Sequence, residues 1–479
     1  MSKVDLEKYF KPNLKEARKR STDRIEELKF QLSDAHQKIG VNKTYMIHTY
    51  GCQGNEADSE SIAGILELMG FTKAVSEATS DVIIMNTCAI RENAENRVWG
   101  ELGRLKAYKK TNPDLIIGLA GCMAQEENVV ERVLKKYQHI DLVFGTHNIY
   151  KLPEYIETAL FSKERVIEVY SQEGEIVENL PKVRNHKFKA WVNIMFGCDE
   201  FCTYCIVPYT RGKERSRSKE EIILEVQELV EQGYKEITLL GQNVNAYGKD
   251  FKDSNYTFGD LLHDLDQLDI KRIRFTTSHP HDLDQKTMRA MKDSKHIMPF
   301  FHLPVQSGSN EVLKKMNRHY TKESYLKVLN ELKETVPGIA VTTDIIVGFP
   351  GETDADFLET LDLVEKAQFE GAFTFVFSKR EGTPAAKFVD DTKEETKKER
   401  LYLLNDRTNA GYLKGNQRFL GQTVKVLVDG VSKNNDDVLA GYSEHNKLVN
   451  FKGDKSLIGQ IVEVKISVAK TWFLLGDLL

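Results

Sequence analysis

Two stretches of the chain alternate short apolar runs with amphipathic segments, and the first lies between residues 43 and 160. Its apolar runs are TYMIHTYGC, DVIIMNTC and DLIIGLAGC, which predict buried strands. The segments between them, EADSESIAGILELMGF and RENAENRVWGELGRLKAYKK, have helical periodicity. This alternation is typical of a parallel sheet, so residues 43–160 predict an α/β domain. The preceding residues, 1–42, are charged throughout and predict a helical extension.

The second alternating stretch covers residues 184–415 and contains six candidate strands. They are AWVNIM, EITLL, RIRFT, FFHLPV, AVTTDIIVG and AFTFVF. Six βα units are too few for a standard eight-stranded barrel, so we expect a partial (β/α)6 barrel with an open side. The acidic segment SQEGEIVENLP predicts a linker before it, and β-rich residues 417–479 predict a small antiparallel barrel of a kind often used on RNA.

Length, composition and charge indicate a soluble protein of several domains. A chain of 479 residues with 41% hydrophobic and 29% charged residues predicts about three soluble domains. Neither a membrane-spanning run nor a signal peptide is recognisable, so we expect a cytoplasmic protein whose thiols stay reduced. A net charge of −5 excludes binding of nucleic acid through bulk positive charge. Any such contact has to come from a local patch, of which RGKERSRSK is the candidate.

The stretch GCDEFCTYC changes this picture because it carries three of the six cysteines, Cys198, Cys202 and Cys205. Structural zinc takes four ligands, and a redox pair needs only C-x-x-C. Three thiolates on a cubane iron–sulfur cluster leave one iron without a protein ligand. An open metal position is where substrate or cofactor binds. The absence of a close fourth ligand therefore favours an iron–sulfur cluster.

The other three cysteines, Cys52, Cys88 and Cys122, each follow a predicted strand and lie 36 and 34 residues apart. Because the carboxyl ends of parallel strands share one edge of a sheet, we expect these thiols to meet there. Small buried cysteines without a ligand are the alternative.

The C-x-x-x-C-x-x-C spacing after the first barrel strand resembles the signature of radical S-adenosylmethionine (SAM) enzymes. The chain beyond residue 42 is similar to the radical SAM methylthiotransferase family, MiaB type, in TYGCQGNEADSE, NTCAIRENAENRVWGELGRLK, LAGCMAQ, HLPVQSGSNEVLKKMNR, DIIVGFPGET and GYSEHNKLVNF. The resemblance implies a C-terminal TRAM domain at residues 417–479. It also implies methylthiolation at C2 of N6-isopentenyladenosine, beside the anticodon in tRNA.

The resemblance assigns roles to both cysteine sets. Cys198, Cys202 and Cys205 would bind a 4Fe–4S cluster whose open iron chelates SAM, and cleavage of that SAM would give a 5′-deoxyadenosyl radical. Cys52, Cys88 and Cys122 would bind a second 4Fe–4S cluster that carries the transferred sulfur, with a second SAM as methyl donor. A radical is needed because C2 bears an unactivated C–H bond. Both clusters are then expected to face one cavity.

Further contacts and partners are also implied by the resemblance. The SAM contacts expected at strand ends are Tyr204, Gly241, Gln242, Asn243, Gln306, Ser307, Asp344 and Gly348. The tRNA phosphates are expected to meet Arg211, Lys213, Arg215 and Arg217. The expected partners are the tRNA anticodon stem-loop, an electron donor such as flavodoxin or ferredoxin, and a sulfur or iron–sulfur carrier, with no membrane and a monomeric protein.

Three other functions remain open on the sequence. A sister methylthiotransferase would act on another tRNA adenosine or on a ribosomal-protein aspartate, although IRENAEN and WGELGRLK favour the MiaB type. A non-catalytic iron–sulfur sensor that binds RNA would have no use for SAM-type loops. A radical RNA methyltransferase would not need the N-terminal cysteines.

Overall fold

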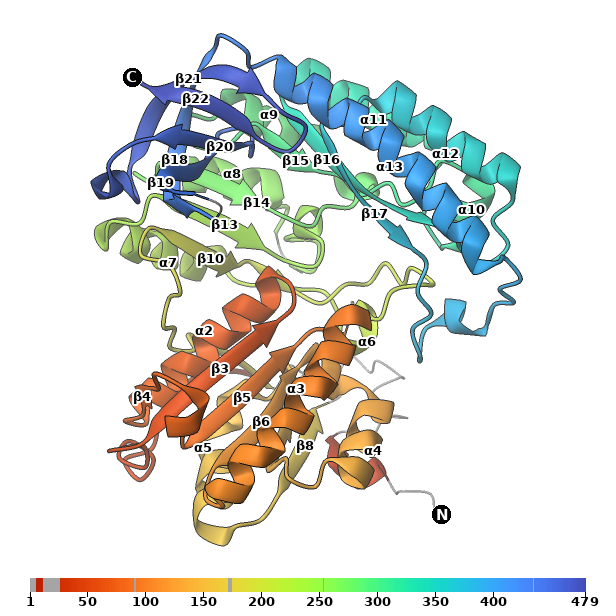
Figure 1. Ribbon diagram of the computed structural model, residues 1–479. Helices are drawn as coiled ribbons and strands as arrows, with labels where there is room; N and C mark the ends of the chain where they lie inside the picture. Colours follow the sequence, from red (N-terminus) through yellow and green to blue (C-terminus); the bar gives the residue numbers. More distant parts are fainter. Residues whose placement is uncertain (1–5, 12–25, 90–91, 171–174, 253, 434) are drawn as a thin grey trace. The chain divides into compact units, whose positions relative to one another are not determined.

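The computed structural model describes residues 6–11, 26–89, 92–170, 175–252, 254–433 and 435–479 (Figure 1). Two compact units make up the chain. The first contains the described residues up to Asn185 together with Phe196–Asp199 and Cys205–Glu214, and the second contains His186–Met195, Glu200–Tyr204 and Arg215–Leu479. None of the described helices has the length and apolarity needed to cross a membrane.

A seven-stranded parallel sheet forms the centre of the first unit, in the order β1-β8-β7-β6-β5-β3-β4. Its strands are β1 Phe10–Lys11, β3 Thr44–Tyr50, β4 Thr72–Lys73, β5 Val82–Thr87, β6 Ile116–Gly121, β7 Leu142–Phe144 and β8 Val166–Tyr170. Helices α3 (Glu92–Thr111) and α4 (Glu127–Lys136) pack on one face, while α2 (Gln53–Leu68) and α5 (Leu152–Glu157) pack on the other. Both faces are therefore covered, which is why the central strands β5 and β6 are apolar without alternation.

The N-terminal extension differs from its prediction in the part that the structure describes. Phe10–Lys11 is strand β1, and Glu26–Lys29 is strand β2, which pairs in parallel with β9 (Glu175–Glu178). Strand β9 lies inside the segment expected to be only a linker. The helix predicted at Glu26–Lys29 and the linker predicted at Glu175–Glu178 are therefore both wrong, because the two segments pair as strands. Glu7–Tyr9 is a single 3-10 turn, and residues 30–42 form coil and turns where a helix was expected. The rest of the helical prediction falls on residues 1–5 and 12–25, outside the described residues.

The second unit begins with a partial barrel of six parallel strands, as predicted. Three of them, β10 (Lys189–Asn193), β13 (Glu236–Leu240) and β14 (Arg272–Phe275), form one sheet, and β15 (Phe300–His302), β16 (Ala340–Val347) and β17 (Gly371–Val376) form another. A parallel bridge between Ile273 and Ile297 continues the first sheet toward the second. The helices in this region are α7 Lys219–Glu231, α8 Phe258–Asp266, α9 Gln285–Asp293, α10 Asn310–Lys315, α11 Lys322–Thr335, α12 Asp354–Ala367 and α13 Glu394–Gln417. One continuous apolar core joins these strands to their helices.

The C-terminal residues form the predicted small barrel, which is closed in the order β18-β19-β20-β22-β21. Its strands are β18 Thr423–Ser432, β19 Asn435–Ser443, β20 Leu448–Lys452, β21 Ile461–Ala469 and β22 Leu474–Leu478. Two buried arginines of β14 bind its backbone. Arg272 donates to the carbonyls of Lys425 and Tyr442, each at 2.8 Å, and Arg274 donates to the carbonyl of Ser443 at 2.7 Å. These contacts fix the small barrel on the six-stranded one.

Candidate active site

The three N-terminal cysteines lie at the carboxyl ends of neighbouring strands, as the sequence predicted. Cys52 follows β3, Cys88 follows β5 and Cys122 follows β6, and these strands are adjacent in the sheet. A side-chain hydrogen bond with Cys88 lowers the pKa of Cys52 to about 5. Burial raises the pKa of Cys122. The first unit thus brings three thiols to one edge of its sheet, and Cys52 and Cys122 among them have pKa values shifted in opposite directions.

The cysteine set does not have the spacing of a preformed site for one metal ion. Tetrahedral zinc with Zn–S bonds of about 2.3 Å holds its sulfurs about 3.8 Å apart. The sulfurs of Cys52, Cys88 and Cys122 do not all lie within 4.8 Å of one another. The expected 4Fe–4S ligand set at these residues stays a prediction.

A buried arginine completes this site and replaces one predicted phosphate contact. Arg211 is only 6% exposed. Its Nε donates to Cys122 Sγ at 3.1 Å, and its Nη2 donates to Asp58 Oδ2 at 2.6 Å. In the structure this guanidinium is therefore directed to a thiol and a carboxylate of the protein, and it is not available to the phosphates that the basic run suggested.

The loop GCDEFCTYC is fixed within each unit by backbone contacts. In the first unit, Cys198 N donates to Gly212 O at 3.2 Å, and a Cβ on Gly197, whose φ is 75°, would lie 2.0 Å from Lys213 O. In the second unit, Asn317 Nδ2 donates to the carbonyls of Glu200 and Phe201 at 3.2 and 3.1 Å. The expectation that both clusters face one cavity concerns the two units together and stays a prediction.

Cys202 is buried and also has an arginine as its partner. Arg318 Nη1 donates to Cys202 Sγ at 3.1 Å, and Arg318 Nε donates to Tyr320 Oη at 2.8 Å. Phe201, the residue before Cys202, has a φ of 47°, which is strained for a side chain of that size. Asn317 and Arg318 thus hold a strained cysteine segment from a loop more than a hundred residues away in the sequence.

The loops after β13 and β14 contain buried polar groups without hydrogen-bond partners among the described residues. These atoms are Asn243 Oδ1, both side-chain polar atoms of Asn245, and Ser278 Oγ. The loops are joined by a hydrogen bond from Val244 N to Thr277 O at 2.9 Å. Buried polar atoms are normally paired, so these atoms indicate a site for a polar ligand.

The predicted contacts after β13 have different environments. Asn243 is buried and its Nδ2 donates to Asp282 Oδ2 at 2.5 Å, which aims the side chain. Gly241 allows close packing, because a Cβ there would lie 2.6 Å from Met195 Cγ. Gln242 is half-buried between them. Asn243 Oδ1 is buried and has no hydrogen-bond partner among the described residues.

His279, after β14, belongs to the same region and was missed in the sequence. Burial, with Arg318 nearby, lowers its pKa to about 2, so the ring is neutral. Its Nε2 lies 3.4 Å from Glu200 Oε2 without forming a hydrogen bond, and its ring centre is 5.7 Å from that of Tyr320. No spacing in the sequence marks such a residue, because its neighbours Glu200, Arg318 and Tyr320 come from two other loops.

The two predicted contacts after β15 have different roles: Gln306 forms backbone hydrogen bonds, and Ser307 packs against a helix. Gln306 has a φ of 71° and exchanges backbone hydrogen bonds with Asp344 and Ile346. Ser307 is fully buried, and its Oγ lies 3.4 Å from Thr360 Oγ1 on α12. Ser307 therefore faces the helix layer and supports the loop.

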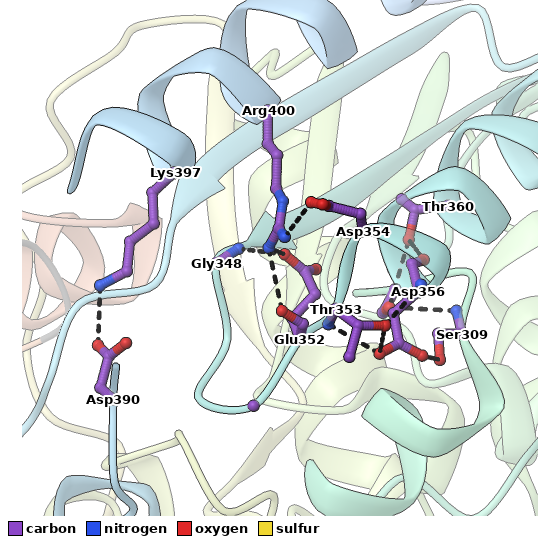
Figure 2. Close-up of polar contacts among 12 residues, drawn as sticks. Ser309, Gly348, Glu352, Thr353, Asp354, Asp356, Thr360, Asp390, Lys397 and Arg400 are labelled. Atoms are coloured by element: carbon purple, nitrogen blue, oxygen red, sulfur yellow. Dashed lines mark hydrogen bonds and ion pairs between the residues drawn. The ribbon is translucent and has the colours of Figure 1, made fainter. Parts of the chain in front are cut away.

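Gly348, after β16, is held by a polar network (Figure 2). Its N donates to Glu352 Oε2 at 2.7 Å, and its φ of 68° is one that glycine adopts readily. The same Glu352 oxygen accepts a 2.8 Å hydrogen bond from Arg400 Nη1 of α13. Asp344 lies four residues earlier, on the opposite face of β16 from the buried core, and its Oδ1 is 3.4 Å from His302 Nε2.

The remaining predicted contacts are three basic residues and one tyrosine. Arg217 is buried and its Nη1 donates to Asn193 O at 2.6 Å and to Glu225 Oε2 at 2.8 Å, so it is not available to phosphate either. Lys213 is exposed and Arg215 is half-buried. Tyr204 packs against the apolar cluster that includes Met316 and Phe349.

Comparison with known proteins identifies three matched regions in the chain. Family models match at residues 44–145 (uncharacterized protein family UPF0004), 192–364 (radical SAM superfamily) and 417–479 (TRAM domain). The tRNA-2-methylthio-N(6)-dimethylallyladenosine synthase of Oceanobacillus iheyensis is 56% identical, over 98% of this chain and 92% of its own length. The synthase of the same name from Bacillus cytotoxicus is 56% identical, over 99% of this chain and 94% of its own.

The chain belongs to this family of synthases. A solved radical SAM methyltransferase, TsrM from Kitasatospora setae with cobalamin and a [4Fe-4S] cluster bound, shares the fold with a TM-score of 0.51. It is 14% identical, and the match covers 72% of this chain and 77% of that one. The predicted α/β fold class and the radical SAM barrel are thereby confirmed.

Proposed function

We propose that this protein is a tRNA methylthiotransferase that adds a methylthio group at C2 of N6-isopentenyladenosine beside the anticodon. The identity to the two named synthases supports the substrate and the reaction. The observation that carries the proposal is the thiol set Cys52, Cys88 and Cys122, which meets at one sheet edge in the same chain as a radical SAM barrel. A radical RNA methyltransferase would not need that set.

SAM and two 4Fe–4S clusters are the cofactors of this family, and the residues present fit them. When bound, they supply the radical chemistry, the methyl group and the sulfur that substitution at an unactivated C–H bond requires. We assign one cluster to Cys52, Cys88 and Cys122 and the other to Cys198, Cys202 and Cys205. The protein's own part is to hold each thiol and, through Asn317, to hold the strained backbone before Cys202.

The polar groups of SAM are assigned to the loops after β13 and β14. Asn243, Asn245 and Ser278 are buried and offer donors and acceptors without partners among the described residues. Neutral His279 adds a ring nitrogen that makes no hydrogen bond there. A ligand that pairs these atoms removes the cost of burying them, which is about 1–3 kcal/mol for each unsatisfied group.

The apolar slot for the isopentenyl-bearing base is assigned to β17. Thr374 Oγ1 donates to Asn405 on α13 at 2.5 Å, so Thr374 faces the helix layer. Successive side chains of a strand point to opposite faces, and Phe373 and Phe375 accordingly point away from α13, 55% and 43% exposed. Large apolar side chains this exposed on a barrel strand are suited to receiving a ligand.

The register of the sheet connects this slot to the rest of the site. Phe373 lies beside Asp344 and Phe375 beside Ile346, in paired positions of β17 and β16. The His302 ring centre is 5.8 Å from that of Phe373. One sheet face thus offers two aromatic rings for base stacking next to a carboxylate, and stacking of this kind is sequence-tolerant and sensitive to truncation.

The proposal also includes the contacts with tRNA phosphates and the protein partners. We assign the contacts with tRNA phosphates to Lys213, which is exposed, and Arg215, which is half-buried. We also propose a flavodoxin or ferredoxin as electron donor, a sulfur or iron–sulfur carrier that restores the auxiliary cluster, a cytoplasmic location and a monomeric enzyme.

The deciding experiment combines nucleoside mass spectrometry with iron analysis. Cells lacking the gene should lose methylthio-isopentenyladenosine and accumulate the unthiolated nucleoside. The anaerobically reconstituted protein should hold about eight irons, and replacing either cysteine set with alanine should leave about four. An unchanged nucleoside profile would overturn the substrate, and a zinc-containing protein would overturn the mechanism.

A further inference from the structure

We propose that Arg318 and Arg211 are positioning residues that each donate a hydrogen bond to one cluster-binding sulfur and raise the reduction potential of that cluster, Arg318 by the larger amount. The inference rests on the proposed function in taking the two cysteine sets as cluster ligands. It adds a means by which the protein itself adjusts the two centres separately.

Both contacts have the same form although they lie in different units. Arg318 Nη1 is 3.1 Å from Cys202 Sγ, and Arg211 Nε is 3.1 Å from Cys122 Sγ. All four side chains are less than a tenth exposed. Guanidinium is charged at every accessible pH, and a short contact between buried groups is weakly screened by solvent. The charge therefore acts on the sulfur directly.

The two arginines differ in how their charge is compensated. Arg211 forms a two-pronged ion pair with Asp58, through Nη1 at 3.3 Å and Nη2 at 2.6 Å. Arg318 uses its other nitrogens on neutral oxygens, Tyr320 Oη and Pro304 O. In the part of the chain that the structure describes, no carboxylate forms an ion pair with Arg318. Cys202 thus faces a whole positive charge, whereas Cys122 faces a charge that Asp58 largely cancels.

The sign of the effect follows from elementary electrostatics. A cluster gains negative charge when it accepts an electron, so a neighbouring cation and an N–H donor to its sulfur favour the reduced form. Loss of the cation makes reduction harder. The effect should be larger at Cys202, because no carboxylate of the described residues forms an ion pair with its arginine.

The experiment uses the full-length chain, reconstituted anaerobically with iron and sulfide, in two backgrounds. One lacks Cys52, Cys88 and Cys122 and holds only the SAM-site cluster; the other lacks Cys198, Cys202 and Cys205. Potentials are read by electron paramagnetic resonance during titration with dithionite. Arg318→Gln should move the SAM-site potential downward by at least about 59 mV, a tenfold change for a one-electron couple.

The auxiliary cluster provides an internal test of sign. Arg211→Gln should lower its potential by less, and Asp58→Asn should raise it, because Arg211 is then uncompensated. The exposed Arg289→Gln serves as a matched control and should change neither potential. Unchanged potential in Arg318→Gln with iron retained would overturn the proposal, as would shifts of one sign in Arg211→Gln and Asp58→Asn.

Arg318→Lys decides the case in which Arg318→Gln loses its iron or does not fold. Lysine keeps the charge, so the proposal expects iron at this site and a potential near that of the parent. Loss of iron in the lysine variant too, or a potential well below the parent's, would assign Arg318 to packing alone and overturn the proposal. If the variants show these shifts but the parent enzyme forms no methylthio product, the proposed function is contradicted and the proposal on the arginines is kept.

Discussion

Arg400 of α13 and Glu352 in the loop after β16 form a buried ion pair, with 2.8 Å between Nη1 and Oε2. The same carboxylate oxygen accepts the N–H of Gly348, so the pair anchors a loop at the predicted SAM site (Figure 2). Burial raises the pKa of Glu352 although Arg400 opposes this. The charged form of Glu352 therefore depends on the ion pair with Arg400.

The first prediction concerns this anchor. Arg400→Met should destabilise the protein by about 3 kcal/mol, the usual cost of leaving one partner of a buried pair alone. It should also raise the KM for SAM, because the Gly348 loop loses its support. Arg407→Met, at an exposed position on the same helix, should change neither. Thermal unfolding and SAM-cleavage assays provide the measurements, and an unchanged KM would separate Gly348 from the SAM site.

A second prediction tests the support of the cysteine loop. Asn317→Asp keeps the size of the side chain and its tolerance for the observed φ of 59°, but removes the N–H donor to the carbonyls of Glu200 and Phe201. The loop should relax, and iron at the SAM site should fall while the auxiliary cluster is retained. Asn330→Asp on the exposed side of α11 is the control. Full iron content in Asn317→Asp would show that the loop holds its shape without this residue.

The third prediction concerns the aromatic face of β17. Phe373→Ala and Phe375→Ala should each weaken binding of an isopentenylated anticodon stem-loop by about 1–3 kcal/mol, the loss expected for one stacked base. SAM cleavage without RNA should be unaffected. Phe161→Ala removes a ring in the first unit that is 71% exposed, more than either of these, and should leave binding unchanged. Equal affinities in all three variants would place the base elsewhere.

A fourth prediction concerns the buried charges under the small barrel. Arg274 Nε donates to buried Glu236 at 2.9 Å, besides its bonds to the C-terminal backbone. Arg274→Ala leaves that carboxylate without its closest partner and should cost about 3–5 kcal/mol. Arg289→Ala on the surface of α9 should cost almost nothing. Denaturant unfolding measures both, and similar values for the two would mean that Lys189 and Arg272 suffice for Glu236.

The fifth prediction is a dependence of stability on pH. Burial, with Arg418 and Lys447 nearby, lowers the pKa of His445 to about 4, while an unfolded histidine titrates near 6.5. Between these values the unfolded chain binds the extra proton, so stability falls as pH drops through that window. His445→Gln should therefore recover about 1–2 kcal/mol of the loss between pH 7.5 and pH 5. His263→Gln, on an exposed face of α8, should recover none, and parallel pH profiles for the two variants would contradict the assignment.

Much of this architecture could be predicted from the sequence because it depends on local patterns. The strands that end before Cys52, Cys88 and Cys122 are apolar runs with turn signals, and parallel order then brings their ends together. The six barrel strands follow from the same alternation. The short β1 and β2 were missed because their partners, β8 and β9, are more than a hundred residues away.

The site contacts were harder to predict for the same physical reason. A run of basic residues looks solvent-exposed in the sequence, but Arg211 and Arg217 are buried because Asp58 and Glu225 come from other elements to meet them. Ser307 was predicted as a SAM contact, and its hydrogen bond with Thr360 of α12 could not be read from the sequence. His279 and Arg318 became visible only when separate loops were brought together.

The guanidinium groups of β14 have a consequence for how this chain can be divided. Arg272 and Arg274 belong to the catalytic barrel, yet the oxygens that satisfy them are supplied by residues 425–444. A truncated enzyme ending near residue 416 would keep both arginines and lose these backbone acceptors, with Glu236 left as the hydrogen-bond partner of Arg274. The C-terminal barrel is thus a structural requirement of the radical SAM domain, and that domain is not expected to be stable when it is expressed alone.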